Sequence, residues 1–264
     1  MTSEAAEKLE HFFSLFTGDV RPLLLLDYDG TLAGFRVDRF TARPWAGVRE
    51  LLQDIQRQGR THMAVITGRP ACEIPTMLGL ATPVEVWGLH GAERLYLDGR
   101  KELEEPSEAA REKLDRVREQ LRRNAFGGLF EDKSNAAVMH WRGHSHLQAL
   151  RIERKTRELF EPLAQMDGLS LLDFEAGIEL RVGRDKGGAV EAIIEEAGRD
   201  KPVTYLGDDL TDEAAFRAVN QAEAAHVSVL VRHEPRETAA DIWLRPPEEL
   251  RMFLKKWREA LSRN

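Results

Sequence analysis

Two aspartates that could carry out phosphoryl transfer follow a run of four leucines in the segment LLLLDYDGTL, residues 23–32. The carboxylate of Asp27, the first of them, can attack phosphorus and form an aspartyl-phosphate. Asp29, two residues on, can give a proton to a leaving oxygen and later take one from water. Because aspartate is also common in turns, the pair alone is compatible with an ordinary strand end. Other parts of the chain have to discriminate between a catalytic pair and a turn.

Two further segments offer groups that bind phosphate. Thr67 ends an apolar run in ITGR and precedes Gly68 and Arg69, so its hydroxyl and the amides after it can hydrogen-bond phosphate oxygens. Lys186 opens a helical pattern in RDKGG and can offset the repulsion between a carboxylate and a phosphate ester. Taken singly, Thr67 could be a helix N-cap and Lys186 a solvated charge.

A fourth segment, the acidic GDDLTDE at 207–213, contributes Asp208, Asp209 and Asp212. Mg²⁺ prefers hard oxygen ligands, usually a few carboxylates together with water and substrate phosphate. Asp27 and Asp208 can supply such carboxylates, so we predict a Mg²⁺ cofactor. Four polar segments in this chain order favour a phosphoryl-transfer site over a set of unrelated turns.

The elements that must position these groups alternate along the chain. Short apolar runs rich in Val, Ile and Leu suit strands buried on both faces, and apolar residues at helical spacing lie between them. This alternation predicts an α/β fold whose parallel sheet is covered on both faces. Such sheets bind ligands at the carboxyl ends of their strands, where the polar residues above are found. The expected strands are 22–30, 61–69, 202–209 and 227–231, and the expected helices include 45–58, 186–197 and 246–263.

The middle of the chain has a different pattern, which predicts an inserted α+β domain. A hairpin is expected at 93–103, around Asp98-Gly99, because this dipeptide favours tight hairpin turns. After it we expect a charged helix at 106–123, an alternating strand at 128–142, a helix at 145–164 and a strand pair at 169–182. The predicted domains are therefore a core made of 1–98 and 180–264, and an insert at 99–179.

Composition narrows the class of protein. The chain has 264 residues and a formal net charge of -7, which argues against a nucleic-acid partner. The single cysteine, Cys72, excludes an internal disulfide and fits a reducing compartment. The sequence carries no signal-peptide pattern and no apolar run near the ~20 residues of a membrane span. We therefore expect a cytoplasmic protein; its oligomeric state is left open, and a monomer is compatible with the sequence.

The four segments together resemble the motifs of the haloacid-dehalogenase-like (HAD) phosphatase superfamily. The resemblance implies a Rossmann-like core in which Asp27 is the nucleophile, Asp29 the general acid and base, and Thr67 and Lys186 complete the catalytic set. Gly68 and Arg69 would then bind substrate. The implied Mg²⁺ ligands are Asp27, Asp29, Asp208 and Asp212, with Asp208 preferred over Asp209 and Asp212 for direct contact. The gap between Thr67 and Lys186 is where one class of these enzymes carries a C2-type cap that determines substrate specificity.

Three longer segments are similar to trehalose-6-phosphate phosphatases: GLHGAE at 88–93, EDKSNAAVMHWR at 131–142 and GIELRVGRDKGGAV at 177–190. By this resemblance, Glu131, Lys133 and Glu179 hold the sugar hydroxyls, which pair well with carboxylates and ammonium groups. The chain departs from the family pattern at Trp141, where Tyr is usual, and at Val182, where Pro is usual. The alternative for the three charged residues is the polar outer face of a half-covered sheet.

The resemblance implies hydrolysis of a small-molecule sugar phosphate, most specifically trehalose 6-phosphate, through an aspartyl-phosphate. Other sugar or glycosyl-glycerate phosphatases and phosphomutases of the same superfamily remain alternatives. A non-catalytic sugar-phosphate-binding module is a further alternative, although all the motif positions hold the residues that catalysis requires. A transition-metal site at His140, His144 and His146 is disfavoured, because no cysteine or carboxylate with suitable spacing joins them.

Overall fold

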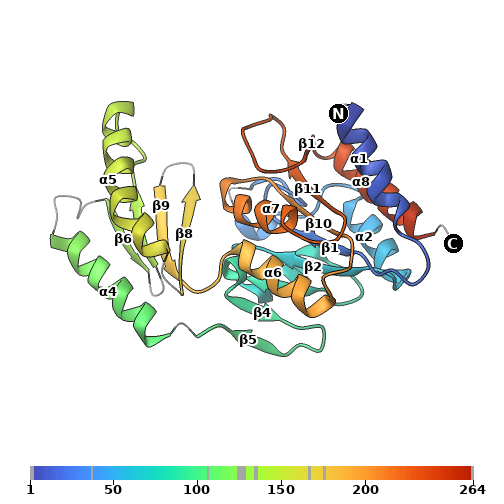
Figure 1. Ribbon diagram of the computed structural model, residues 1–264, viewed down its shortest axis with the longest axis horizontal. Coiled ribbons are helices and arrows are strands. Elements are labelled where there is room, and N and C mark those ends of the chain that lie inside the picture. The colour runs from blue at the N-terminus through green and yellow to red at the C-terminus, as the bar shows by residue number, and fades with distance from the viewer. Residues whose placement is uncertain are drawn as a thin grey trace. The chain divides into compact units, whose positions relative to one another are not determined.

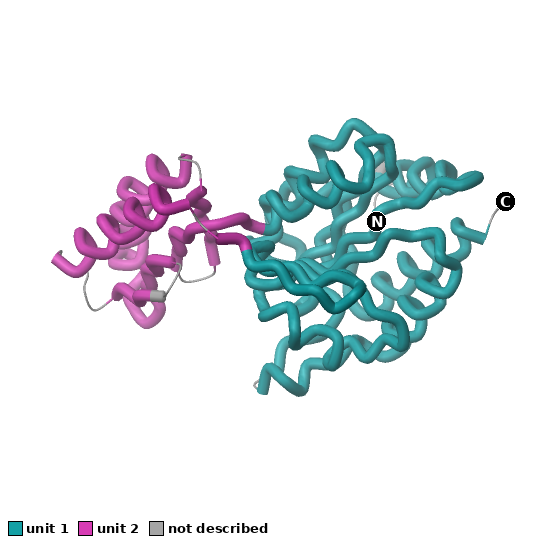
Figure 2. The backbone as a smooth tube through the Cα atoms, turned by 90° about the horizontal axis from the view of Figure 1, so that it is seen from below, with its two compact units in different colours: residues 1–103, 186–264 teal, residues 104–185 magenta. Residues whose placement is uncertain are grey.

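The structure is a computed structural model of the chain, and it divides into two compact units that are described separately. Unit 1 comprises residues 1–103 and 186–264, and unit 2 comprises residues 104–185 (Figure 2). The residues that the structure describes are 3–36, 38–105, 107–123, 129–133, 136–165, 168–174 and 177–262.

Unit 1 is built on an eight-stranded sheet, counted over the described residues, in the order β12-β11-β10-β1-β2-β3-β4-β5. Six neighbouring strands, β12 to β3, run parallel, and β4 and β5 extend the sheet as an antiparallel edge. This arrangement confirms the predicted α/β class. The strands are β1 (Leu23–Leu26), β2 (His62–Ile66), β3 (Glu85–Gly88), β4 (Glu93–Leu95), β5 (Lys101–Leu103), β10 (Val203–Gly207), β11 (His226–Val231) and β12 (Ile242–Leu244).

Helices cover both faces of this sheet because its central strands are apolar on both sides. In β1, Leu24 and Leu26 join a core cluster with α1 (Ser3–Ser14), α2 (Val48–Arg57), α3 (Ile74–Leu78) and α8 (Glu248–Leu261). The alternate residues, Leu23 and Leu25, join a second cluster with α6 (Lys186–Ala197) and α7 (Glu213–Asn220), seen in front of the sheet in Figure 1. All four leucines are fully buried, so β1 is fixed from both sides.

The predicted hairpin at 93–103 is present. Its strands β4 and β5 pair with Leu95 opposite Lys101, and Gly99 adopts φ +85° in the turn. This positive φ is the reason for glycine after Asp98. Short 3₁₀ turns complete the connections of unit 1: η1 (Arg39–Thr41), η2 (Ala71–Glu73), η3 (Leu89–Gly91) and η4 (Leu210–Asp212).

Unit 2 contains a four-stranded antiparallel sheet, counted over its described residues, in the order β6-β7-β9-β8. Its elements are α4 (Glu108–Arg123), β6 (Phe130–Lys133), β7 (Ala136–His140), α5 (His146–Ala164), β8 (Leu169–Phe174) and β9 (Gly177–Val182). The prediction of one strand across 128–142 is wrong, because β6 and β7 are two antiparallel strands of a hairpin. An alternating pattern of apolar and polar residues does not reveal where the chain reverses direction when both strands of a hairpin show that pattern.

The expected insert, 99–179, and unit 2 share residues 104–179. Residues 101–103 form strand β5 of unit 1, and β9, which ends at Val182, belongs to the sheet of unit 2. Within the described residues, no helix has the length and apolar character that crossing a membrane would require.

Candidate active site

The four sequence motifs of the core occupy ends of elements in unit 1. Asp27 directly follows β1, Thr67 follows β2 and Asp208 follows β10, and these are neighbouring parallel strands. Their carboxyl ends therefore meet at one edge of the sheet. Lys186 is the first residue of α6. The structure thus brings these predicted residues together, although they lie up to 181 positions apart in the sequence (208 minus 27).

Lys186 joins the first and last motifs through a buried ion-pair network. Its Nζ lies 2.8 Å from Asp27 Oδ1 and 2.7 Å from Asp212 Oδ1, and the three side chains are at most 5% exposed. Burial by itself would lower the pKa of Lys186, but the carboxylates of Asp212 and Asp27 raise it above its ordinary value. The amine is therefore held in its charged form, which suits a group that neutralises a phosphate ester.

Asp212 is held on every side by hydrogen bonds. Its Oδ1 accepts from Lys186 and from the Tyr205 hydroxyl, and its Oδ2 accepts from the backbone N–H groups of Asp208 and Asp209, each at 2.9 Å. A carboxylate has about four lone-pair sites. Because four donors already fill them, Asp212 is suited to orienting the loop and Lys186.

Burial beside other acidic groups makes Asp27 and Asp208 hold their protons more tightly than ordinary aspartates do. Burial raises the pKa of Asp27 to about 7, and burial together with Asp27 and Asp212 raises the pKa of Asp208 to about 9. Oxygens of Asp27, Asp208 and Asp212 all lie within 4.8 Å of one another. Three buried carboxylates beside one ammonium fit a divalent cation that prefers oxygen ligands, such as Mg²⁺.

Gly30 allows Asp208 to approach the loop after β1. It has φ +81°, and a Cβ atom built on it would lie 2.0 Å from Asp208 Oδ2. Its N–H donates to the carbonyl of Ala33, which closes the turn. Any larger residue would both strain the backbone and displace the carboxylate. The close approach of Asp208 therefore explains the glycine at position 30.

The second aspartate of the pair is bound by an arginine. Asp29 Oδ2 accepts from Arg69 Nε at 2.6 Å and Oδ1 from Arg69 Nη2 at 2.7 Å. Asp29 is not part of the group of three close carboxylates, so its role as a metal ligand stays a prediction. The backbone N–H of Arg69 also donates to Thr67 Oγ1 at 3.2 Å, and Gly68 lies between these two residues in the same turn.

The predicted sugar-binding residues lie in unit 2. Glu131 and Glu179 both pair with Val138, so the three side chains share one face of the sheet. The helices pack on the other face, where the core cluster includes Ala137 and Ile178. Lys133 ends β6, and its side chain is outside the described part of the structure.

Sequence reasoning missed Arg181 and Tyr205. Arg181 stands two residues after Glu179, so strand alternation puts it on the same face, and this signal could have identified it. It is 2% exposed, and burial lowers its pKa although the Glu179 carboxylate opposes this. Tyr205 looked like an ordinary apolar strand residue, and only its contact with Asp212 reveals its role.

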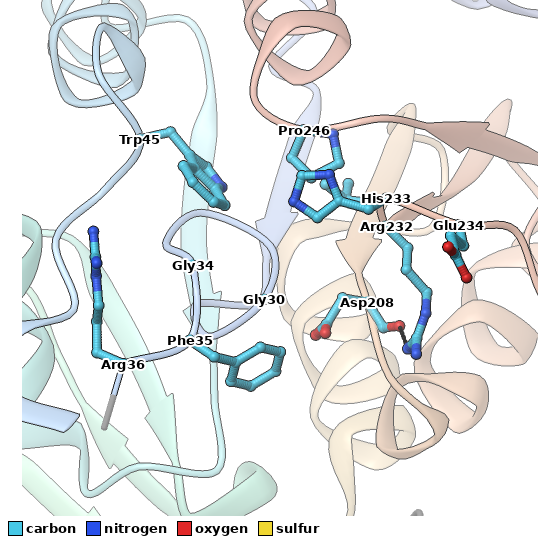
Figure 3. Close-up of a pocket in the computed structure, with 11 residues that line it drawn as sticks. Gly30, Gly34, Phe35, Arg36, Trp45, Asp208, Arg232, His233, Glu234 and Pro246 are labelled. Atoms are coloured by element: carbon cyan, nitrogen blue, oxygen red, sulfur yellow. Dashed lines mark hydrogen bonds between the residues drawn. The ribbon is translucent and has the colours of Figure 1, made fainter. Parts of the chain in front are cut away.

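A cavity of about 510 Å³ opens beside Asp208 on unit 1. Figure 3 shows it between the loop that carries Phe35 and the segment that carries Arg232, whose guanidinium donates to the Asp208 carbonyl. Trp45 and His233 meet edge to face along its upper side, with ring centroids 6.2 Å apart. The lining residues are Gly30, Gly34, Phe35, Arg36, Trp45, Asp208, Val231, Arg232, His233, Glu234 and Pro246.

Comparisons with known proteins identify a family for this chain. The family model described as trehalose-phosphatase matches residues 25–247. The chain is 31% identical to a trehalose-phosphate phosphatase of Mycobacterium marinum, over 92% of this chain and 63% of the relative's length. It is 30% identical to a trehalose-6-phosphate phosphatase-related protein of Thermoplasma acidophilum, over 88% of this chain and 95% of that protein.

The fold is similar to that of a solved Aspergillus fumigatus trehalose-6-phosphate phosphatase, with a TM-score of 0.75 and 22% identity over 97% of each chain. It is also similar to a haloacid dehalogenase-like hydrolase from B. subtilis, with a TM-score of 0.61, 18% identity and coverage of 88% of this chain and 98% of that one. The chain spans 63% of the length of the mycobacterial relative. By its motifs and the match over residues 25–247, this chain belongs to the trehalose-phosphatase family.

Proposed function

We propose that the chain is a Mg²⁺-dependent phosphatase that converts trehalose 6-phosphate and water into trehalose and phosphate. One observation carries this proposal: the buried Asp27 carboxylate lies 2.8 Å from Lys186 and within 4.8 Å of Asp208. A nucleophile, a fixed cation and a further carboxylate for a metal are the parts that phosphoryl transfer to a carboxylate requires.

In the first step, a carboxylate oxygen of Asp27 forms a bond to phosphorus while the bond from phosphorus to the sugar oxygen breaks. The leaving sugar oxygen takes a proton from Asp29. Before that, Asp29 has to exchange its contact with Arg69 for a proton, and the phosphate of the substrate offers the guanidinium another anionic partner. Arg69 therefore connects substrate binding to the release of Asp29.

In the second step, water attacks the phosphorus of the aspartyl-phosphate and Asp29 accepts its proton. The bond between phosphorus and the Asp27 oxygen breaks, which regenerates the carboxylate and releases phosphate. Lys186 keeps its charge in the intermediate because the Asp212 carboxylate and the phosphoryl group remain beside it. Thr67 and the amide of Gly68 supply hydrogen bonds to the phosphoryl oxygens.

Mg²⁺, when bound, would neutralise charge on the phosphoryl oxygens and orient them for in-line attack. Asp27 and Asp208 are the residues we propose as its direct protein ligands. The four hydrogen bonds to Asp212 support a positioning role for that carboxylate instead.

We further propose that unit 2 provides the sugar specificity of the enzyme. Glu131 and Glu179 share a sheet face with the buried Arg181, and such a row of charged groups suits the hydroxyls of a disaccharide. The exposed Cys72 is compatible with the predicted cytoplasmic location.

The test is phosphate release from a panel of sugar phosphates by the purified chain with Mg²⁺. We expect the highest kcat/KM for trehalose 6-phosphate, with glucose 6-phosphate and mannose 6-phosphate at least about 10²-fold poorer, because unmatched polar groups are costly. Faster phosphate release from another ester would identify that ester as the substrate in place of trehalose 6-phosphate. Formation of an isomerised sugar phosphate without free phosphate would indicate a mutase. Binding without turnover would indicate a non-catalytic module.

A further inference from the structure

The turn after β3 has a strained backbone. Leu89 has φ +50° and His90 has φ +60°, and they are the two non-glycine residues with positive φ in the part of the chain that the structure describes. Residues other than glycine seldom adopt this region, leucine in particular, although asparagine, aspartate and histidine do so more often than the rest. Such conformations persist where the surrounding structure enforces them, and they gather at functional sites.

Both strained residues are tied to the turn of Thr67. The His90 N–H donates to the Thr67 carbonyl at 2.8 Å, and the Leu89 N–H donates to the Arg69 carbonyl at 2.9 Å. The two turns are therefore clamped together through consecutive backbone groups. The positive φ values let both N–H groups face the same turn, which an extended strand with alternating groups would not do.

The His90 ring occupies the space beside Gly68. A Cβ atom built on Gly68 would lie 2.7 Å from both Cε1 and Nε2 of His90, and its three nearest atoms all belong to this ring. Gly68 has no positive φ, so close approach of the ring accounts for the glycine. The imidazole thus packs directly on the backbone whose amide faces the phosphate in the proposed mechanism.

The same turn is fixed from a second side. A Cβ atom on Gly88 would lie 2.4 Å from the Ala71 nitrogen and 2.7 Å from the Arg69 carbonyl oxygen. The Glu93 carboxylate accepts a hydrogen bond from the Ala71 N–H at 2.6 Å. Segment 88–93 therefore contacts the chain along residues 67–71, and the His90 side chain is the one that packs on Gly68.

From these contacts we propose that His90 is a positioning residue for the phosphate-binding turn, acting through Gly68 and Thr67. The inference rests on the proposed function, which makes 67–69 the turn that binds the phosphoryl group. Since Asp27, Lys186 and Asp208 are held by other elements, loss of the ring should weaken phosphate binding more than the chemical step.

The first test compares His90→Gly and His90→Asn with the wild-type chain. Glycine keeps the backbone conformation and the N–H but removes the ring, whereas asparagine tolerates the positive φ and keeps a polar side chain. For His90→Gly we expect a dissociation constant for inorganic phosphate raised about tenfold, and kcat lowered by less than about threefold. His90→Asn should recover part of the affinity. Phosphate binding is measured calorimetrically with Mg²⁺ present.

The second test is a double-mutant cycle with Gly68→Ala. The added methyl group collides with the His90 ring, so the single variant should lose phosphate affinity about 10²-fold, and His90→Gly/Gly68→Ala should regain the affinity of His90→Gly. Gly88→Ala is the matched control, since its methyl group meets backbone atoms and His90→Gly should not rescue it.

Phosphate affinity within twofold of the wild type in both His90 variants would overturn the inference, as would a double variant no better than Gly68→Ala. If His90→Gly does not fold, His90→Asn alone decides, because unchanged affinity there contradicts a positioning role for the ring. These measurements use inorganic phosphate, so they remain decisive if trehalose 6-phosphate is not the substrate. Conversely, a failed substrate panel with an intact cycle would reject only the proposed function.

Discussion

The Asp29 carboxylate lies in the fork of the Arg69 guanidinium, with oxygen–nitrogen distances of 2.6 and 2.7 Å. Arg69 is 7% exposed, and its hydrogen bonds to Asp29 raise its pKa above the ordinary value. The third guanidinium nitrogen of Arg69, Nη1, donates a hydrogen bond to the Glu73 carboxylate at 3.3 Å. The same carboxylate also accepts a hydrogen bond from Arg39. The proposed acid–base residue and a predicted phosphate-binding residue are therefore coupled before substrate arrives.

This coupling predicts the effect of Arg69→Lys. The variant keeps the charge but loses the fork that holds both carboxylate oxygens, so we expect kcat/KM to fall about 10²-fold. Steady-state kinetics with Asp29→Asn and the double variant should reveal strong non-additivity. Arg39→Lys is the matched control, because Arg39 contacts Glu73 but not Asp29. Additive losses in the cycle would argue against the coupling.

Asp27→Asn should abolish turnover while the protein stays folded. An amide cannot form the aspartyl-phosphate, and we expect kcat to fall at least about 10³-fold. Circular dichroism should be unchanged, since asparagine has the same shape. Asp209→Asn, one residue after Asp208, is the control and should keep more than about a third of the activity. Substantial activity in Asp27→Asn would disprove the covalent mechanism.

Lys186→Met should destabilise the fold strongly. It leaves the buried carboxylates of Asp27 and Asp212 without their ammonium partner, and we expect a loss of about 3–5 kcal/mol in the free energy of unfolding without metal. Lys256→Met removes an exposed pair with Glu10 and should cost less than about 1 kcal/mol. Urea unfolding of both variants checks this contrast, which equal losses would contradict.

The stability of the metal-free protein should fall as the pH rises. The pKa values of Asp27, about 7, and of Asp208, about 9, exceed the ordinary aspartate value, so the folded state holds more protons than the unfolded chain above roughly pH 4. Stability therefore falls from roughly pH 4 upward, and the loss is complete near pH 7 for Asp27 and near pH 9 for Asp208. By linkage, each extra proton held costs up to about 1.4 kcal/mol per pH unit.

Mg²⁺ should offset this loss because it binds the deprotonated carboxylates. We expect the rise in Tm on adding Mg²⁺ to be larger near pH 8.5 than near pH 6, and Asp208→Asn to remove most of it. Thermal unfolding with and without chelator measures both effects. A Tm shift that is independent of pH, or that survives Asp208→Asn, would contradict the proposed ligand.

The proposed specificity of unit 2 predicts separate effects on two substrates. Glu179→Gln should raise KM for trehalose 6-phosphate about tenfold. The KM for p-nitrophenyl phosphate, which has no sugar hydroxyls, should stay within about twofold of the wild-type value. Glu112→Gln, on the exposed side of α4, serves as the control. Equal losses with both substrates would assign Glu179 a structural role.

The sequence by itself determined the class of fold and the core motifs. Alternating apolar runs and helical spacing identify parallel strands, because burial on both faces leaves a continuous pattern such as that of β1. The polar residues after those runs could be recognised because strand ends in such sheets lie at one edge. For that reason Asp27, Thr67 and Asp208 were identifiable without coordinates, whereas Lys186 was identifiable because it opens a helical pattern.

Only the tertiary structure decided which of those side chains contact one another. The sequence segment GDDLTDE does not say which acid is free, since this depends on the donors that Tyr205 and Lys186 bring from other elements. The Asp29–Arg69 fork joins residues 40 positions apart. The contact of His90 with Gly68 depends on two positive φ values that no local pattern encodes. Long-range contacts of this kind are set by packing, whereas the strands and helices follow from local periodicity.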